Sequence, residues 1–207
     1  FTVEDEDITL LDAKLDNYDF LGWYSDGRKI GVIQTSIATS LTLEAKWQLT
    51  EYSIEYKNLK GASSSGFVTS YTVESENITL PSLSVEHYTF NGWIDQNGKK
   101  ITSIRKGSFG DLVLTADFTP IEYKIEYLNV KDADLSKFRT SYNVESESFL
   151  LPTPTTDYYD FLDWVDENGN EISSIKEGSF GDLVLTARFT PKEYKIQCQD
   201  GKRNEEE

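Results

Sequence analysis

The sequence has few of the residues that cross-link a chain or carry out catalysis. Its 207 residues include one cysteine, one histidine and no methionine. Because Cys198 is alone, no intrachain disulfide can form, and units of small size must be held together by packing. No stretch of about 18 apolar residues occurs that could span a bilayer. Since methionine is missing even at position 1 and Phe1–Glu4 reads as part of a strand, we interpret the chain as a segment of a larger protein.

Basic residues are scarce as well. The chain has 20 Lys and Arg residues against 36 Asp and Glu residues, which gives a net charge of -16. A surface of this sign repels phosphate backbones and anionic lipids, so we expect no nucleic-acid partner and no membrane contact by this segment. Aromatic residues, in contrast, make up 13% of the chain, too many for a disordered segment. The sequence therefore predicts a folded, acidic protein.

Tandem repetition organises the chain. Residues 51–121 align with residues 122–192 at an offset of 71, without a gap and with more than half of the positions identical. A more diverged copy comes first, because Tyr18–Trp23 matches Tyr88–Trp93. At the other end, Glu193–Ile196 repeats the start of the third copy. The sequence thus predicts four segments: repeat 1 without its first strand (1–50), repeat 2 (51–120), repeat 3 (121–191), and the first strand of a further repeat with a polar tail (192–207).

The pattern within one repeat predicts a mostly β unit, α+β at most. Apolar and polar residues alternate along Glu122–Tyr127, Phe138–Val144 and Leu112–Phe118, as in half-buried strands. Tyr88–Ile94 reads as a further strand, and Asn97–Gly98 after it predicts a tight two-residue hairpin turn with positive φ angles. The expected core of repeat 2 consists of Ile54, Tyr56, Tyr71, Val73, Leu80, Phe90, Trp93, Ile104, Leu112, Leu114 and Phe118. Because Pro120 stiffens the short link to the next repeat, we expect the units to be arranged as a rod.

The repeated motif resembles a known family. Tyr-x-Phe-x-Gly-Trp, a hairpin turn and Gly-Ser-x-Gly-Asp-Leu-x-Leu-x-Ala are similar to the Listeria-Bacteroides repeat, also called the internalin B-repeat. The resemblance implies a compact β-grasp-like fold carried in tandem on extracellular bacterial proteins, wall-attached or secreted, where it serves as a spacer or an adhesive module. The third repeat departs from the motif, since Asp163 stands in place of Gly92. The first repeat has Ser36–Ser40 in place of the Gly-Ser-Phe-Gly segment.

The residues offer no catalytic, cofactor-binding or metal-ligating site. His87 aligns with Asn17 and Tyr158, so a catalytic dyad or a metal site would exist in one copy only, and Cys198 has no histidine near it in sequence. Asp166–Asn170 is rich in oxygen ligands but lacks the spacing of a calcium loop, and a hairpin turn explains it better. Asn77–Thr79 fits a glycosylation acceptor, although it lies in a strand-like run. We expect a non-enzyme without cofactors.

Two functions remain open. In the first, the segment is a spacer or stalk that presents other domains at the bacterial surface. In the second, it is an adhesion module that binds a host or matrix protein or a glycan directly. Candidate contact regions for the second function are the loops Gly61–Gly66 and Asp132–Lys137 and the acidic patches Glu74–Glu76 and Glu145–Glu147. The strand-like segment Glu193–Gln199 could also fill the first repeat of a neighbouring molecule, giving head-to-tail association.

Overall fold

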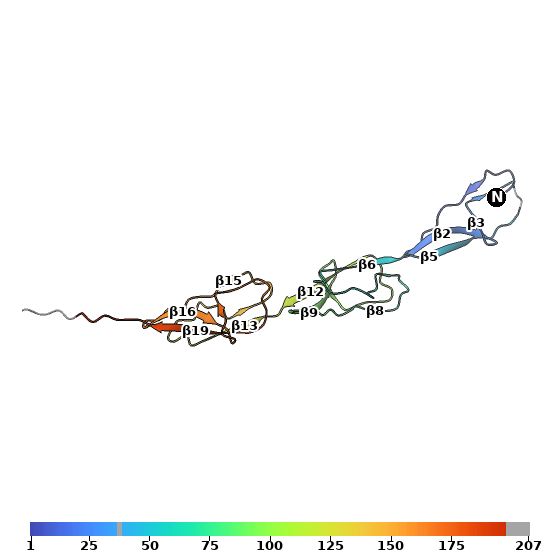
Figure 1. Ribbon diagram of the computed structural model, residues 1–207. Helices are drawn as coiled ribbons and strands as arrows, with labels where there is room; N and C mark the ends of the chain where they lie inside the picture. Colours follow the sequence, from blue (N-terminus) through green and yellow to red (C-terminus); the bar gives the residue numbers. More distant parts are fainter. Residues whose placement is uncertain (37–38, 198–207) are drawn as a thin grey trace, which may run out of the picture. The chain divides into compact units, whose positions relative to one another are not determined.

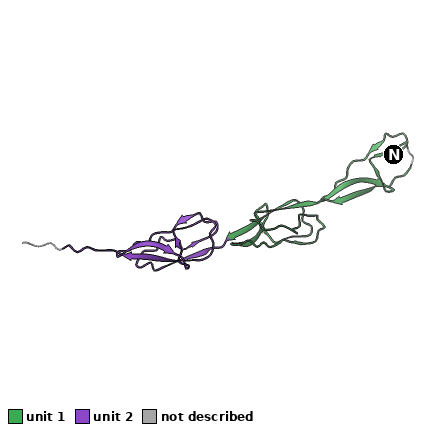
Figure 2. Ribbon diagram, viewed as in Figure 1, with its two compact units in different colours: residues 1–119 green, residues 120–207 purple. Residues whose placement is uncertain are grey.

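The protein is a chain of small β sheets. The computed structural model describes residues 1–36 and 39–197 (Figure 1). The chain divides into two compact units, Phe1–Thr119 and Pro120–Glu207 (Figure 2). Every regular element of the described residues is a strand, and none is a helix, which confirms the prediction of a mostly β fold. The rod, the likeness to the β-grasp and the repeat boundaries stay predictions.

The strands fall into three groups that follow the repeats. The first group is β1 (Ile8–Thr9), β2 (Tyr18–Ser25), β3 (Arg28–Ile30), β4 (Val32–Ile33) and β5 (Glu44–Leu49). The second is β6 (Tyr52–Lys57), β7 (Ser70–Tyr71), β8 (Ile78–Thr79), β9 (Tyr88–Ile94), β10 (Lys100–Ile101), β11 (Ser103–Ile104) and β12 (Leu112–Pro120). The third is β13 (Tyr123–Leu128), β14 (Ser141–Tyr142), β15 (Phe149–Leu150), β16 (Tyr159–Val165), β17 (Glu171–Ile172), β18 (Ser174–Ile175) and β19 (Leu183–Pro191).

Repeats 2 and 3 each contain a five-stranded sheet with the same order. The order is β10-β9-β12-β6-β7 in repeat 2 and β17-β16-β19-β13-β14 in repeat 3. The first and last long strands of each repeat lie side by side and parallel, with Ile54 opposite Leu112 and Ile125 opposite Leu183. Two short strands form a separate pair in each repeat, β8 with β11 and β15 with β18. The alternating pattern predicted the long strands well, because one face of each is buried.

The first repeat has an open sheet. Its order is β3-β2-β5, so β5 is an edge strand among the described residues. The counterpart of β5 in repeat 2, β12, begins three residues earlier in the aligned sequence, since Leu41–Leu43 lies outside any strand whereas Leu112–Leu114 is paired with β6. The parallel partner therefore extends the last strand. Trp23 is correspondingly half-buried, while Trp93 is only 2% exposed.

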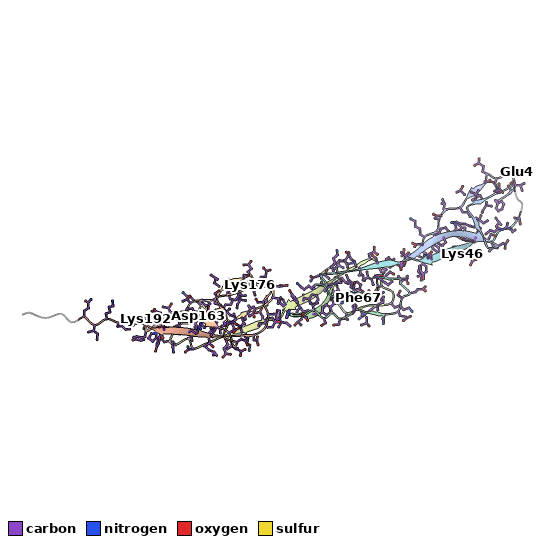
Figure 3. The ribbon with its side chains drawn as sticks, viewed as in Figure 1. Glu4, Lys46, Phe67, Asp163, Lys176 and Lys192 are labelled. Atoms are coloured by element: carbon purple, nitrogen blue, oxygen red, sulfur yellow. The ribbon has the colours of Figure 1, made fainter. Side chains whose placement is uncertain are left out.

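The core of repeat 2 agrees largely with the sequence prediction. Ile54, Tyr71, Trp93 and Leu114 are buried, and Phe90 packs against them half-buried. The predicted list lacked two of the buried members, Leu83 and Ala116, and six of the partly buried residues packed against them, among them Ile78 and Phe67. Phe67, labelled in Figure 3, lies in the loop before β7 and stacks edge-on against Trp93, with ring centroids 6.3 Å apart. Its loop has no alternating pattern that could have indicated a buried side chain. Val73 is half-buried but does not belong to the cluster.

Three local predictions need correction. The second strand is much shorter than the expected Phe138–Val144, because only Ser141–Tyr142 pairs with β13. The two-residue turn occurs in repeat 1, where Asp26 and Gly27 both have positive φ, but in repeats 2 and 3 only the glycine of the turn does. There the Asp95 N–H donates to the Lys99 carbonyl, which closes a loop one residue longer.

The predicted strand at the end of the chain is not formed by its described part. Residues 193–197 have no strand pairing, and Cys198 and Gln199 lie outside the described residues. Tyr194 and Ile196 are 71% and 92% exposed. A strand requires a partner for its backbone groups, and no described strand pairs with this segment.

Candidate functional site

The aspartate of the repeated Gly-Asp-Leu sequence holds the first strand of its own repeat. Asp111 Oδ1 accepts a hydrogen bond from the Ser53 backbone N–H at 2.7 Å, and Asp182 Oδ1 accepts one from the Lys124 N–H at 2.8 Å. The hydrogen bonds from Ser53 lower the pKa of the Asp111 carboxyl. This motif residue is thus used to fix β6 beside β12.

The recurring tryptophan has an equivalent use. The indole Nε1 donates to a backbone carbonyl twelve residues upstream in each repeat: Trp23 to Leu11 at 2.8 Å, Trp93 to Pro81 at 2.7 Å and Trp164 to Pro152 at 2.8 Å. In repeats 2 and 3 the ring itself is buried. The structure therefore places both rings in the core of their repeats.

A tyrosine and an asparagine complete the recurring set. The Tyr71 hydroxyl donates to the Gly110 carbonyl and the Tyr142 hydroxyl to the Gly181 carbonyl, both at 2.6 Å. Burial raises the pKa of both phenols. Asn58 and Asn129, which end the first strand of repeats 2 and 3, donate from Nδ2 to the carbonyls of Ala116 and Ala187 at 2.8 and 2.7 Å. Among the described residues, every buried side-chain polar atom has a partner.

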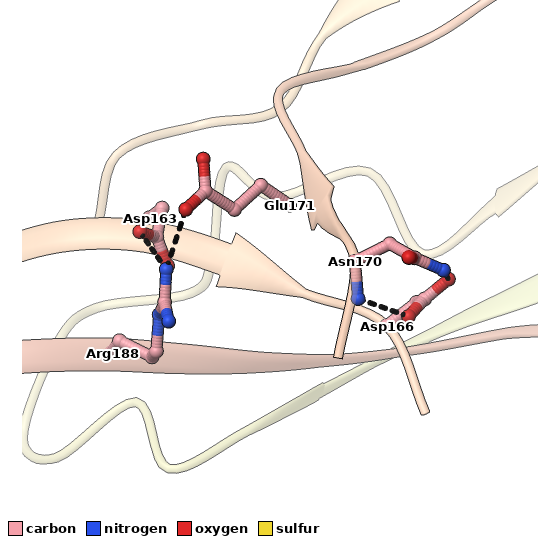
Figure 4. A network of polar contacts seen from close by, with 5 residues as sticks. All are labelled: Asp163, Asp166, Asn170, Glu171 and Arg188. Carbon is pink, nitrogen blue, oxygen red and sulfur yellow. Dashed lines mark hydrogen bonds and ion pairs between the residues drawn. The ribbon is translucent and has the colours of Figure 1, made fainter. Parts of the chain in front are cut away.

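Asp163 belongs to a surface network that occurs in the third repeat alone. Arg188 on β19 binds the Asp163 carboxylate with both Nε and Nη2, and also contacts Glu171 at 2.8 Å (Figure 4). Hydrogen bonding to Arg188 lowers the pKa of the Asp163 carboxyl. At the equivalent positions repeat 2 has Gly92, Lys100 and Asp117.

The backbone conformation explains the glycine at this position. Gly92 has a φ of 123° and Gly22 a φ of 135°, a conformation that side chains rarely adopt. A Cβ added to them would also lie 2.8 Å from Lys100 Cε and 2.5 Å from Lys29 Cε, but the end of a lysine chain can move aside. Repeat 3 has Glu171 in place of the lysine, and Asp163 does not adopt a positive φ.

The remaining single residues lie in turns. His87 is half-buried with a φ of 67° just before β9, where repeat 1 has Asn17 with a φ of 65°. Asp166 accepts hydrogen bonds from the backbone N–H groups of Asn168 at 2.9 Å and of Asn170 at 2.8 Å, the latter drawn in Figure 4. The hydrogen bond from the Asn170 side chain and these backbone bonds lower the pKa of the Asp166 carboxyl. Both its oxygens serve the hairpin turn.

Asn77 serves the fold in the same way, because its Oδ1 accepts from the Lys106 backbone N–H at 2.9 Å. In the part of the chain that the structure describes, no group of three or more His, Cys, Asp or Glu residues is placed to hold a metal ion. None of these residues lies in a helix long and apolar enough to cross a membrane.

Comparison with known families agrees with this pattern. Residues 52–117 match the sequence profile of the Listeria-Bacteroides repeat domain. Repeat 2 is a Listeria-Bacteroides repeat. The family is typical of bacterial surface and extracellular proteins, so repeat 2 is a module of that type. Neither the curated proteins nor the solved structures give a match to the chain.

One surface feature recurs in repeats 2 and 3. Phe109, in the Gly-Ser-Phe-Gly loop, is 70% exposed, and its counterpart Phe180 in repeat 3 is 61% exposed. Each borders a shallow hollow, of about 590 Å³ in repeat 2 and 310 Å³ in repeat 3. The hollow of repeat 2 has the wider lining and includes the counterparts of all residues that line the hollow of repeat 3. Besides Phe180, those of repeat 3 are Tyr142, Ile172, Ser174, Ile175, Ser179 and Leu183. Sequence reasoning placed this loop in the motif without recognising its exposed ring.

The candidate contact regions named from the sequence are mostly exposed. Gly61–Gly66 and Asp132–Lys137 form loops with few buried side chains. In the acidic patches, Glu76 pairs with Lys106 at 2.7 Å, and Glu74 accepts a hydrogen bond from the Tyr18 hydroxyl at 2.7 Å. Part of the acidic charge of the first patch is therefore compensated by neighbouring side chains.

Proposed function

We propose that the chain is a non-catalytic spacer that presents other domains of an extracellular bacterial protein, wall-attached or secreted. The observation that supports this most is the use made of the recurring polar residues. Asp111, Tyr71, Trp93 and Asn58 all bond to the backbone of their own repeat. A motif whose polar groups serve the fold is expected of a module that is repeated for its shape rather than for its chemistry.

The net charge supports the same function. A charge of -16 keeps neighbouring chains apart and favours a soluble, unaggregated segment. A spacer gains from such a surface, because it must keep other domains accessible without binding to its surroundings.

The test is replacement in the parent protein. Residues 1–207 are exchanged for an unrelated rod of equal length, and for a flexible Gly-Ser linker with the same number of residues. A spacer predicts that the rod preserves the activity of the presented domains and that the linker, which spans a shorter average distance, does not. Loss of activity with the rod would contradict the proposal.

The second candidate function is adhesion to a host or matrix protein or a glycan. The exposed rings of Phe109 and Phe180 favour it, since exposed aromatic residues next to a hollow are typical of binding hot spots. The test is a binding screen with the monomeric chain and with F109A/F180A. Saturable binding that the double variant loses would support adhesion, and equal binding by both would contradict a role for these rings.

A further inference from the structure

The first and last strands of a repeat are the two through which the chain enters and leaves it. In repeat 2 these are β6 and β12, which lie parallel and are paired from Ile54 opposite Leu112 to Lys57 opposite Thr115. In repeat 3, β13 and β19 are paired in the same way from Ile125 opposite Leu183 to Leu128 opposite Thr186. The two ends of each repeat therefore meet in one strand pair.

This arrangement determines how tension acts on the repeat. Tension along the chain pulls β6 at its N-terminal end, Tyr52, and β12 at its C-terminal end, Pro120. Because the two strands are parallel, these opposite forces slide one strand along the other. All hydrogen bonds between the strands then bear the load together. In an antiparallel pair pulled from one end, the bonds would instead break one after another.

Side chains close this strand pair at both of its ends. At the start of the pair, Asp111 accepts hydrogen bonds from the Ser53 N–H and, at 2.9 Å, from the Ser53 hydroxyl. At its end, the Asn58 side chain donates a hydrogen bond to the Ala116 carbonyl. Repeat 3 has the same two contacts, from Asp182 and Asn129. Leu114 and Leu185 between them are fully buried, which keeps water away from the centre of the pair.

We propose that repeats 2 and 3 are mechanical clamps that resist tension applied along the chain. The inference deepens the spacer function and rests on it for its biological meaning, since a stalk under pulling forces must keep its length. Among the described residues of repeat 1 no such parallel pair is formed. There β5 pairs only with the antiparallel β2, and Tyr18 lies opposite Leu49, so tension at these two residues opens the pair from its end.

Single-molecule stretching of the full chain tests this directly. With Cys198 replaced by serine and handles at both termini, we expect extension of repeat 1 at low force, followed by two events at severalfold higher force. Each of the two should release up to roughly 230–250 Å of chain, at 3.3–3.6 Å per residue. Extension of all three repeats at one low force would overturn the proposal.

The direction of pulling supplies a control that leaves the fold intact. Lys57 and Thr115 are opposite each other and exposed. Handles attached through K57C and T115C pull the same strand pair apart from one end, and the high-force event of repeat 2 should then disappear. An unchanged force in this geometry would show that overall stability, not the clamp, resists the pull.

Variants of one repeat provide the matched comparison. Asp182→Ala with Asn129→Ala removes both side-chain contacts from repeat 3, and one of the two high-force events should move to lower force while the other remains. Asp160→Ala, which removes a carboxylate from β16 outside the strand pair, should leave both unchanged. The unfolding forces test only the clamp proposal, whereas replacement of the segment in the parent protein tests only the spacer function.

Discussion

Arg188 binds the carboxylate of Asp163 across the β16–β19 pair at a position where repeat 2 has Asp117 and Gly92. The third member of each set also changes its charge, from Lys100 to Glu171. The two repeats therefore use opposite charge arrangements at the same aligned positions. In one the lysine chain covers a glycine, and in the other an arginine bridges two carboxylates.

Transplanting one set into the other repeat should show that its members depend on each other. Gly92→Asp alone forces a side chain onto a backbone with φ 123° and against Lys100, so we expect a loss of about 1–3 kcal/mol in the stability of repeat 2. Adding Lys100→Glu and Asp117→Arg should restore part of it. Hydrogen exchange of the β9 amides measures the loss of stability in the single variant and its recovery in the triple variant. Equal exchange in the single and triple variants would contradict the coupling.

The tryptophans should differ in importance between repeats. Trp164→Phe leaves a cavity and an unpaired Pro152 carbonyl in a dry core, and we expect it to destabilise repeat 3 by about 2–4 kcal/mol. Trp23→Phe should cost clearly less, because that ring is half-buried in an open sheet. Urea-dependent hydrogen exchange of β16 and β2 gives the two values. A larger loss at Trp23 would mean that repeat 1 has a closed core in solution.

The hairpin turns should respond to alanine differently. In the hairpin turn of repeat 3 only Gly169 has a positive φ, 82°, so Gly169→Ala should cost about 1 kcal/mol and Asn168→Ala less than about 0.5 kcal/mol. In repeat 1, Asp26 has a φ of 48°, and Asp26→Ala should be destabilising. Denaturant midpoints compare the three variants. A costly Asn168→Ala would indicate a two-residue turn in repeat 3 after all.

Acid should weaken the fold through particular carboxylates. The pKa values of Asp111, Asp163 and Asp166 are lowered by hydrogen bonds that exist only in the folded state. Below the unfolded pKa of about 3.9 the unfolded chain therefore binds more protons, so this stability is complete above that pH and is lost as the pH falls through the folded values. The urea midpoint should fall between about pH 4 and pH 2.

Removing these carboxylates should reduce the effect of acid. D111N/D163N/D166N is expected to show a smaller change of midpoint between these pH values than the unchanged chain. D12N/D132N/D160N removes the same charge from other exposed positions and corrects for the general loss of repulsion on protonation. If both triple variants change equally, the named hydrogen bonds do not carry the acid sensitivity.

Sequence alone predicted the elements whose pattern is local. Tyr88–Ile94 was predicted with the bounds it has, and the alternation in Leu112–Phe118 identified the last strand. The parallel pairing of β6 with β12 was not predicted, because alternation gives a strand its buried face but not its neighbour. Phe67 was missed for a related reason, since a lone aromatic residue in an irregular loop is buried only by partners distant in sequence.

The predictions about chemistry depended on repetition. The role of Asp111 as a support for β6 could not be derived from sequence, because its partner is a backbone N–H 58 positions earlier. The exposure of the Phe109 ring could not be predicted from its place in a repeated motif, because a residue recurs both when the fold needs it and when it binds a partner. In Asn97–Gly98 the dipeptide correctly marked a turn but did not define its length.

The pairing of first with last strand also affects how the protein is made. Residues 54–57 find their parallel partner only after Leu112–Thr115 has been synthesised, so a repeat emerging residue by residue remains without its central strand pair until nearly all of it is available. Contacts of such long sequence separation form slowly. Each repeat should therefore fold as one late, cooperative step, and a chain interrupted within a repeat should expose that repeat alone to proteases while leaving the completed ones resistant.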